Sequence, residues 1–261
     1  MLGGAFGFML GGPLGAILGA VLGHNLDRGM EGMKGFEQMH PGDRERVQTA
    51  FFTATFSVMG HLAKADGRVS EDEIAMARRV MDQMDLTQKL RQTAIRLFEE
   101  GKKEDFPLDD VLEQFRHECH RRLTLIQMFV EIQLQAAYAD GVLHQTEEQL
   151  LLHMCQRLNI PEELFRQLEQ MIKAEWHYGR AGRAAPKPAG PSLDDAYAIL
   201  MLSPKSSDAE VKRAYRRLLS QHHPDKLVSK GLPEEMMKIA TQKTHEIRQA
   251  YEQIKQARGM R

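Results

Sequence analysis

Hydrophobic and polar residues divide the chain into stretches with different patterns. Residues 1–23 contain no charged side chain and consist of fourteen apolar residues, eight glycines and one proline. From residue 44 to residue 176, apolar side chains recur every three or four positions, for example at Phe52, Phe56 and Met59. This spacing places them on one side of an α-helix, and no segment shows the period of two that a half-buried strand requires. The pattern predicts an all-α protein.

The N-terminal apolar stretch is predicted to form a single transmembrane helix. Residues 1–23 would extend about 34 Å at about 1.5 Å per residue, enough for a hydrocarbon core of about 30 Å. No basic residue precedes them, which argues against a cleaved signal peptide. The basic residues Arg28, Lys34, Arg44 and Arg46 follow, so the positive-inside rule places the N-terminus outside and the bulk of the chain in the cytoplasm.

Glycine occupies every fourth position of this stretch, at Gly3, Gly7, Gly11, Gly15, Gly19 and Gly23. In water each interior glycine costs a helix about 1 kcal/mol relative to alanine. In lipid, small residues four apart allow two helices to approach closely. We therefore expect a homodimer or small oligomer through the face of Gly7, Gly11, Gly15 and Gly19. The alternative is that these glycines only fill an apolar span.

Two segments interrupt the helical pattern. Residues 24–43, rich in glycine and methionine, are predicted to form a juxtamembrane linker. Residues 177–191 (HYGRAGRAAPKPAGP) combine proline, glycine and basic residues, and are predicted to be a tether that lets the last domain move away from the core. The chain is thereby divided into a helical middle domain, 44–176, and a C-terminal domain, 192–261.

The middle domain contains an internal repeat. Residues 63–86 and 137–160 align without a gap, and each copy is predicted to form a helix, an Ala-Asp-Gly turn and a second helix. The repeat pairs four acidic residues: Asp66 with Asp140, and Glu73 with Glu147. Such residues serve turns and helix caps, and each turn has too few oxygen ligands for an EF-hand calcium loop. Metal binding by these four carboxylates remains the alternative.

The sequence offers few other residues for metal binding or catalysis. Residues 117–120 (HECH) offer two imidazoles and a thiol without a convincing fourth zinc ligand, so we expect them to be structural. The two cysteines, Cys119 and Cys155, form no disulfide framework and fit a reducing compartment. No nucleotide-binding loop or Ser-His-Asp signature occurs. We expect neither enzymatic activity nor a bound metal or cofactor.

Charge is distributed unevenly along the chain. The formal net charge is −1, yet residues 1–176 carry 19 basic and 27 acidic side chains and residues 177–261 carry 16 basic and 9 acidic ones. A basic C-terminal segment could bind nucleic acid, lipid headgroups or an acidic protein surface. Nucleic acid is not expected as a partner, because residues 192–261 have a net charge of only +4 and lack interleaved exposed aromatic residues.

The segment SDAEVKRAYRRLLSQHHPDK (207–226) is predicted to form a two-faced helix that begins with a capping box. Its apolar face consists of Val211, Ala214, Tyr215, Leu218 and Leu219. Its basic face consists of Lys212, Arg213, Arg216 and Arg217. The tripeptide His223-Pro224-Asp225 ends the helix, because a proline biases the preceding residue away from the α region. A second long helix follows, so the tripeptide is expected in a loop at the tip of an antiparallel pair.

These features identify residues 192–261 by resemblance as a J-domain, the DnaJ module that stimulates ATP hydrolysis by DnaK-type chaperones. The resemblance implies that His223, Pro224 and Asp225 engage the chaperone, with Asp225 needing its charge. It also implies that the basic face meets an acidic surface of the chaperone. Met201 departs from the family pattern, which usually has glycine at this position. The zinc-binding domain and Gly/Phe-rich linker of full-length DnaJ are missing from the sequence.

The order of span, helical domain, linker and J-domain resembles the bacterial membrane-anchored DnaJ-like co-chaperones. The middle domain is similar to the TerB domain of tellurite-resistance proteins. Together these resemblances imply a co-chaperone at the cytoplasmic face of the bacterial inner membrane that recruits a DnaK-type partner. The alternative is an envelope-stress or metal-response sensor or scaffold that acts through its TerB-like domain.

Overall fold

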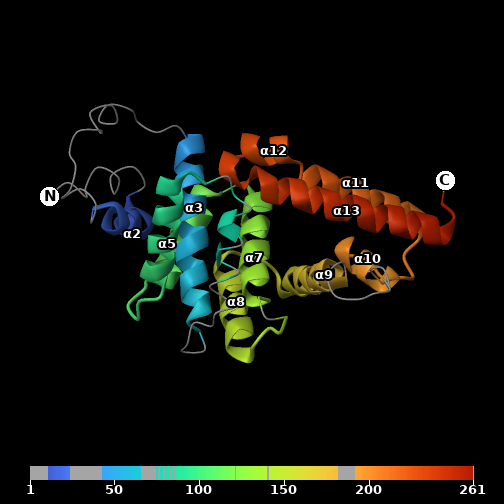
Figure 1. Ribbon diagram of the computed structural model, residues 1–261, viewed down its shortest axis with the longest axis horizontal. Helices are drawn as coiled ribbons and strands as arrows, with labels where there is room; N and C mark the ends of the chain where they lie inside the picture. Colours follow the sequence, from blue (N-terminus) through green and yellow to red (C-terminus); the bar gives the residue numbers. More distant parts are fainter. Residues whose placement is uncertain are drawn as a thin grey trace.

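The computed structural model describes residues 11–23, 43–65, 75, 77–78, 80–82, 84, 86–120, 122–139, 141–181 and 192–260. Within these residues all regular structure is helical (Figure 1). The prediction of an all-α protein is therefore confirmed.

The helices fall into two groups along the chain. The first group is α2 (Gly12–Gly23), α3 (Asp43–Ala63), α5 (Gln88–Gly101), α6 (Leu108–Glu118), α7 (Leu123–Ala137), α8 (Gln145–Arg157) and α9 (Glu162–Ala181). The second group is α10 (Leu193–Ile199), α11 (Asp208–Gln221), α12 (Pro224–Ser229), the 3₁₀ turn η2 (Glu234–Met236) and α13 (Met237–Arg258).

Helix α3 is the centre of the middle domain and packs against α5, α6 and α7 (Figure 1). Phe51 of α3 and Phe115 of α6 are fully buried, with ring centroids 5.9 Å apart. Phe115 also packs against Phe129 of α7, with ring centroids 4.6 Å apart and an interplanar angle of 39°. Gly60 of α3 touches the backbone of α5 so closely that a Cβ atom would collide with the carbonyl oxygen of Phe98. Aromatic packing and this close approach of two helices hold α3 against its neighbours in the middle domain.

Helix α2 lies against the middle domain, where it contacts α3, α5 and α6. Leu14, Ile17, Leu18 and Val21 on one side of α2 are buried there. The side chain of Gln114 clamps the start of the helix, because its Oε1 accepts from the Leu14 N–H at 2.8 Å and its Nε2 donates to the Gly11 carbonyl oxygen at 2.8 Å. Within the described residues, no helix is both long and apolar enough to cross a membrane.

The glycines of the predicted association face are placed only in part. Gly7 lies outside the described residues, and Gly11 is exposed just before α2. Gly15 and Gly19 are buried on α2. In this structure the middle domain therefore covers part of the surface that we expect to face a second copy in the membrane.

The second group of helices has its own core around α11 and α13, which lie side by side (Figure 1). Val211, Leu218, Ile247 and Ile254 are buried between them and α10. The rings of Tyr215 and Tyr251 stack with centroids 4.0 Å apart and an interplanar angle of 10°. The predicted helical pair is thus present.

The C-terminal domain lies against the middle domain. Helix α9 continues to Ala181, through the first five residues of the segment predicted to be a tether, and residues 182–191 lie outside the described part. Ala174 of α9 is buried together with Ala196 and Tyr197 of α10. Apolar periodicity ends near Trp176, but helical hydrogen bonding does not require it, so the sequence pattern placed the end of α9 too early.

Candidate functional site

The basic helix begins as the sequence predicts. The Ser207 Oγ accepts from the Glu210 N–H at 3.3 Å, and the Glu210 carboxylate accepts from the Ser207 N–H at 2.7 Å. This reciprocal pair is a capping box, and it satisfies backbone donors that the first turn of α11 leaves unpaired. The hydrogen bonds from Ser207 also lower the pKa of Glu210. Local side chains therefore fix where α11 starts.

The two faces of α11 differ in exposure. Val211, Ala214 and Leu218 are buried, while Tyr215 and Leu219 are half-buried against the same core. On the other face Arg213, Arg216 and Arg217 are exposed and Lys212 is half-buried. The structure thus brings three guanidinium groups to the surface along one helix, where they form a cationic stripe.

The His-Pro-Asp tripeptide lies at the end of that stripe. Helix α11 ends at Gln221, and His223 has an extended backbone with φ −64° and ψ 121°, as a residue before proline requires. Pro224 is the first residue of α12, where its missing N–H costs nothing and its ring favours the helical φ. The side chains of His223 and Asp225 are exposed.

The tripeptide therefore differs in one respect from the expected loop. Only His223 lies between helices, since Pro224 and Asp225 belong to the first turn of the short helix α12. The sequence analysis treated proline as a stop signal and missed its second role as a helix start. The rigid turn holds the carboxylate of Asp225 at the beginning of α12, where the helix dipole favours a negative charge.

Two buried residues of this region were missed by the sequence analysis. His222 directly precedes the tripeptide, and Lys243 lies on the inner side of α13; both are only 4% exposed. The carboxylates that face them, Glu131 and Glu175, come from the middle domain. A lysine within the apolar spacing of a predicted helix is the one signal that could have indicated such a partner.

The acidic residues of the internal repeat are placed incompletely. Asp66, Glu73 and Asp140 lie outside the described residues. Glu147 is 3% exposed, and its Oε2 accepts from the backbone N–H of His144 at 2.9 Å, so it caps α8. Gly141 has a φ of +96°, the left-handed conformation expected of the glycine in the second Ala-Asp-Gly turn.

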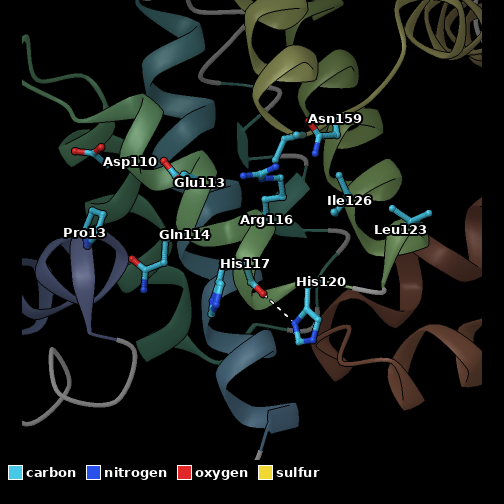
Figure 2. Close-up of a pocket in the computed structure, with 11 residues that line it drawn as sticks. Pro13, Asp110, Glu113, Gln114, Arg116, His117, His120, Leu123, Ile126 and Asn159 are labelled. Carbon is cyan, nitrogen blue, oxygen red and sulfur yellow. Dashed lines mark hydrogen bonds between the residues drawn. The ribbon is translucent and has the colours of Figure 1, made fainter.

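His117 and Glu118 of the HECH segment end α6, Cys119 and His120 follow them, and the two histidines border a cavity with residues of α2 and α7 (Figure 2). Both imidazoles are exposed, and Nδ1 of His120 lies 3.1 Å from the carbonyl oxygen of His117. Cys119 points into the core, and burial raises the pKa of its thiol to about 12. The three groups do not converge. Across the described ranges, no cluster of three or more His, Cys, Asp or Glu side chains is arranged to hold a metal ion.

These features define the class of protein. An antiparallel pair of helices, a cationic stripe on the first and an exposed His-Pro-Asp at its end are the defining elements of a J-domain. The chain is a J-domain co-chaperone, and relatives identify its family. The co-chaperone protein DjlA of Coxiella burnetii is 46% identical over all of this chain and 97% of its own length. That of Photobacterium profundum is 42% identical over 100% of this chain and 99% of its own length. The chain belongs to the DjlA family of co-chaperones.

Further comparisons support this family assignment along the whole chain. The DjlA of Escherichia coli K12 is 45% identical over 84% of this chain and 83% of its own length. Three family models match: the DjlA transmembrane domain over residues 1–34, the tellurite resistance protein TerB over 52–170, and the DnaJ domain over 195–259. The resemblances inferred from the sequence are confirmed, and the protein is membrane-anchored. No solved structure matches the chain.

Proposed function

We propose that this co-chaperone recruits a DnaK-type chaperone through the His-Pro-Asp tripeptide and stimulates its ATP hydrolysis. One observation carries the proposal: His223 and Asp225 are exposed at the point where the arginine-rich face of α11 ends. The partner would therefore meet a fixed carboxylate, an imidazole and the cationic stripe on one continuous surface.

The stripe and the tripeptide have different tasks in this proposal. Arg213, Arg216 and Arg217 attract an acidic surface over a distance and so raise the rate of encounter. A guanidinium also offers a planar fork of donors that suits carboxylates. Pro224 keeps the turn rigid, so that Asp225 is presented with little loss of conformational freedom. None of these side chains reacts chemically, because the ATP and its catalytic groups belong to the chaperone.

The membrane part of the proposal concerns topology and self-association. A single span with a periplasmic N-terminus places the J-domain at the cytoplasmic face of the inner membrane, as the basic residues after the span favour. Association of two spans through Gly7, Gly11, Gly15 and Gly19 requires α2 to leave its contact with α5 and α6, since Gly15 and Gly19 are buried there. The basic domain serves a protein partner in this proposal, not nucleic acid.

The proposal is tested by steady-state ATPase turnover of the host DnaK-type chaperone. The full chain in lipid vesicles should raise turnover, and the His223→Gln chain should not. Because His223 is exposed, we expect its replacement to leave the fold intact. Equal stimulation by both chains would show that the tripeptide is not the point of contact.

A further inference from the structure

A buried group of charges joins the J-domain to the TerB-like domain. Lys243 Nζ of α13 lies 2.6 Å from Glu175 Oε1 of α9 and 3.3 Å from Glu131 Oε2 of α7. His222 Nε2, at the end of α11, lies 3.7 Å from Glu131 Oε1. The four side chains are between 5% and 9% exposed. Glu131 thus contacts both J-domain residues, and we call these four side chains the charge cluster.

Apolar contacts surround the charge cluster. Five J-domain residues are buried in the same core as the middle domain: Leu227, Leu232, Met236, Ile239 and Ala240. Gly231, with a φ of +101°, lies so near α3 that a Cβ atom would be 2.8 Å from Val47 Cγ1. The seat formed by these residues and the charge cluster is therefore specific in shape as well as in charge.

Polar contacts at the edge of this interface hold the J-domain in the same orientation on the middle domain. Gln48 Nε2 donates to the carbonyl oxygen of Leu232 at 3.4 Å, and Lys230 Nζ donates to Thr124 Oγ1 at 3.2 Å. Arg44 pairs with Glu234 at 3.3 Å. These contacts at the surface add little stability, but they show that the segment between α12 and α13 faces α3 and α7 (Figure 1).

The seat holds the tripeptide from both sides without covering it. His222 precedes the tripeptide and is buried 3.7 Å from Glu131, while Leu227 follows it and is fully buried. Between them His223 and Asp225 remain exposed. Residues on both sides of the tripeptide are therefore packed against the TerB-like domain.

Electrostatics make Glu131 the critical member of the charge cluster. Burial alone would lower the pKa of Lys243, but the carboxylates of Glu131, Glu175 and Glu246 together raise it, so the ammonium stays charged. Burial lowers the pKa of His222, which keeps its imidazole neutral. Removing one partner from a buried ion pair leaves the other charge uncompensated, and this is strongly unfavourable. Loss of the Glu131 charge would therefore weaken the hold of the middle domain on Lys243 of α13.

We propose that Glu131 is a positioning residue for the His-Pro-Asp tripeptide: it keeps the J-domain seated on the TerB-like domain, so that the tripeptide is presented to the chaperone in one orientation. This inference rests on the proposed function. When only a fraction of a protein is in the binding-competent state, its apparent affinity falls by that fraction. An unseated J-domain would therefore bind the chaperone more weakly, while a saturating amount would still stimulate fully.

The test compares ATPase stimulation by full chains in lipid vesicles over a range of co-chaperone concentrations. Glu131→Gln should raise the concentration for half-maximal stimulation about tenfold, if seating falls to about one tenth, and leave the maximum unchanged. The matched control is Glu118→Gln. Glu118 is also a buried glutamate in an ion pair, with Arg46 at 2.7 Å, but it lies within the middle domain. This control should keep the wild-type half-maximal concentration.

A cross-link separates positioning from a general loss of structure. Thr124→Cys and Lys230→Cys, joined by a short thiol reagent, should restore the wild-type half-maximal concentration to the Glu131→Gln chain. The native cysteines, Cys119 and Cys155, are buried and should not react. A Glu131→Gln chain that equals or exceeds the wild type, or that the cross-link fails to restore, would overturn the inference.

Failure of this inference can be distinguished from failure of the proposed function. If His223→Gln abolishes stimulation while Glu131→Gln behaves as the wild type, the tripeptide acts on the chaperone but the seat does not position it. If His223→Gln stimulates like the wild type, the proposed function fails, and the positioning role fails with it.

Discussion

At the residue scale, Met201 shows how this chain departs from the usual J-domain pattern. Its φ of +55° is left-handed, a conformation that costs a residue with a side chain about 1 kcal/mol and glycine almost nothing. The methionine side chain, however, packs against both the J-domain core and the middle-domain core. A contact that only a side chain can make accounts for the residue that replaces glycine here.

Replacing Met201 should therefore affect the two domains differently. In Met201→Gly the backbone strain is relieved, but the apolar contact between the domains is lost. We expect hydrogen exchange to become faster in the seat, around Ile239 and Ala240, while amides near Ile247 and Ile254 in the J-domain core keep their protection. Unchanged exchange in the seat would show that Met201 does not hold the domains together.

The exposed arginines of α11 should act mainly on the rate of encounter. Reversing the charge of Arg216 and Arg217 to glutamate should slow association with the chaperone by about tenfold at low salt, because long-range attraction is lost. Arg248→Glu with Lys173→Glu, two exposed reversals on α13 and α9, is the control with the same change of net charge. Stopped-flow binding at several ionic strengths measures the effect, and an equal loss in the control would mean that only net charge matters.

At the element scale, helix α2 illustrates what a sequence pattern leaves open. Leu14, Ile17, Leu18 and Val21 have the spacing of a buried helix face, but every neighbour is apolar or glycine as well. A lipid-facing helix and a helix packed on a protein core therefore have the same signature here. The structure shows α2 on the middle domain, while the family model identifies residues 1–34 as a transmembrane domain.

Self-association in the membrane can be assigned to one face of α2 by substitution. Gly11→Leu with Gly15→Leu should abolish association in a membrane two-hybrid assay, because bulky side chains prevent close helix approach. Ala16→Leu with Ala20→Leu, at exposed positions of the same helix, should leave it unchanged. If the glycine substitutions leave the signal intact, the glycines serve only to fill the span.

At the scale of the whole molecule, local and distant interactions differ in how far the sequence predicts them. Ser207 and Glu210 are three residues apart, so the capping box and the faces of α11 follow from neighbouring residues alone. Lys243 meets Glu131 only because two domains pack together, and no local pattern pairs them. The J-domain and its tripeptide could thus be predicted from the sequence, whereas the seat that orients them could not.

The charge cluster should make the stability of the seat depend on pH. Burial raises the pKa of Glu175 to about 7, against an ordinary value of 4.5, even though Lys243 acts in the opposite direction. The folded protein therefore holds a proton on Glu175 that the unfolded chain has released, and stability falls as pH rises through about 7. On the acid side, burial lowers the pKa of His222 from 6.5, so stability falls as pH drops below that value.

Thermal unfolding measures this dependence. The contribution of Glu175 to stability should be lost as pH rises from about 4.5 to about 7, and Glu175→Gln should remove this loss. The groups facing Glu175 are Lys243, Glu131 and Glu246, with His222 on the far side of Glu131. If the stability of Glu175→Gln falls over this range as much as that of the wild type, the loss belongs to another group.

The central claim is that the exposed tripeptide accelerates ATP hydrolysis by a DnaK-type chaperone. The most direct measurement is a single-turnover experiment, in which a preformed chaperone–ATP complex is mixed with the full co-chaperone in lipid vesicles. The wild-type chain should accelerate hydrolysis. Asp225→Asn, which keeps the shape of the side chain and removes its charge, should leave the rate near that of the chaperone alone. Equal acceleration by both chains would contradict the account.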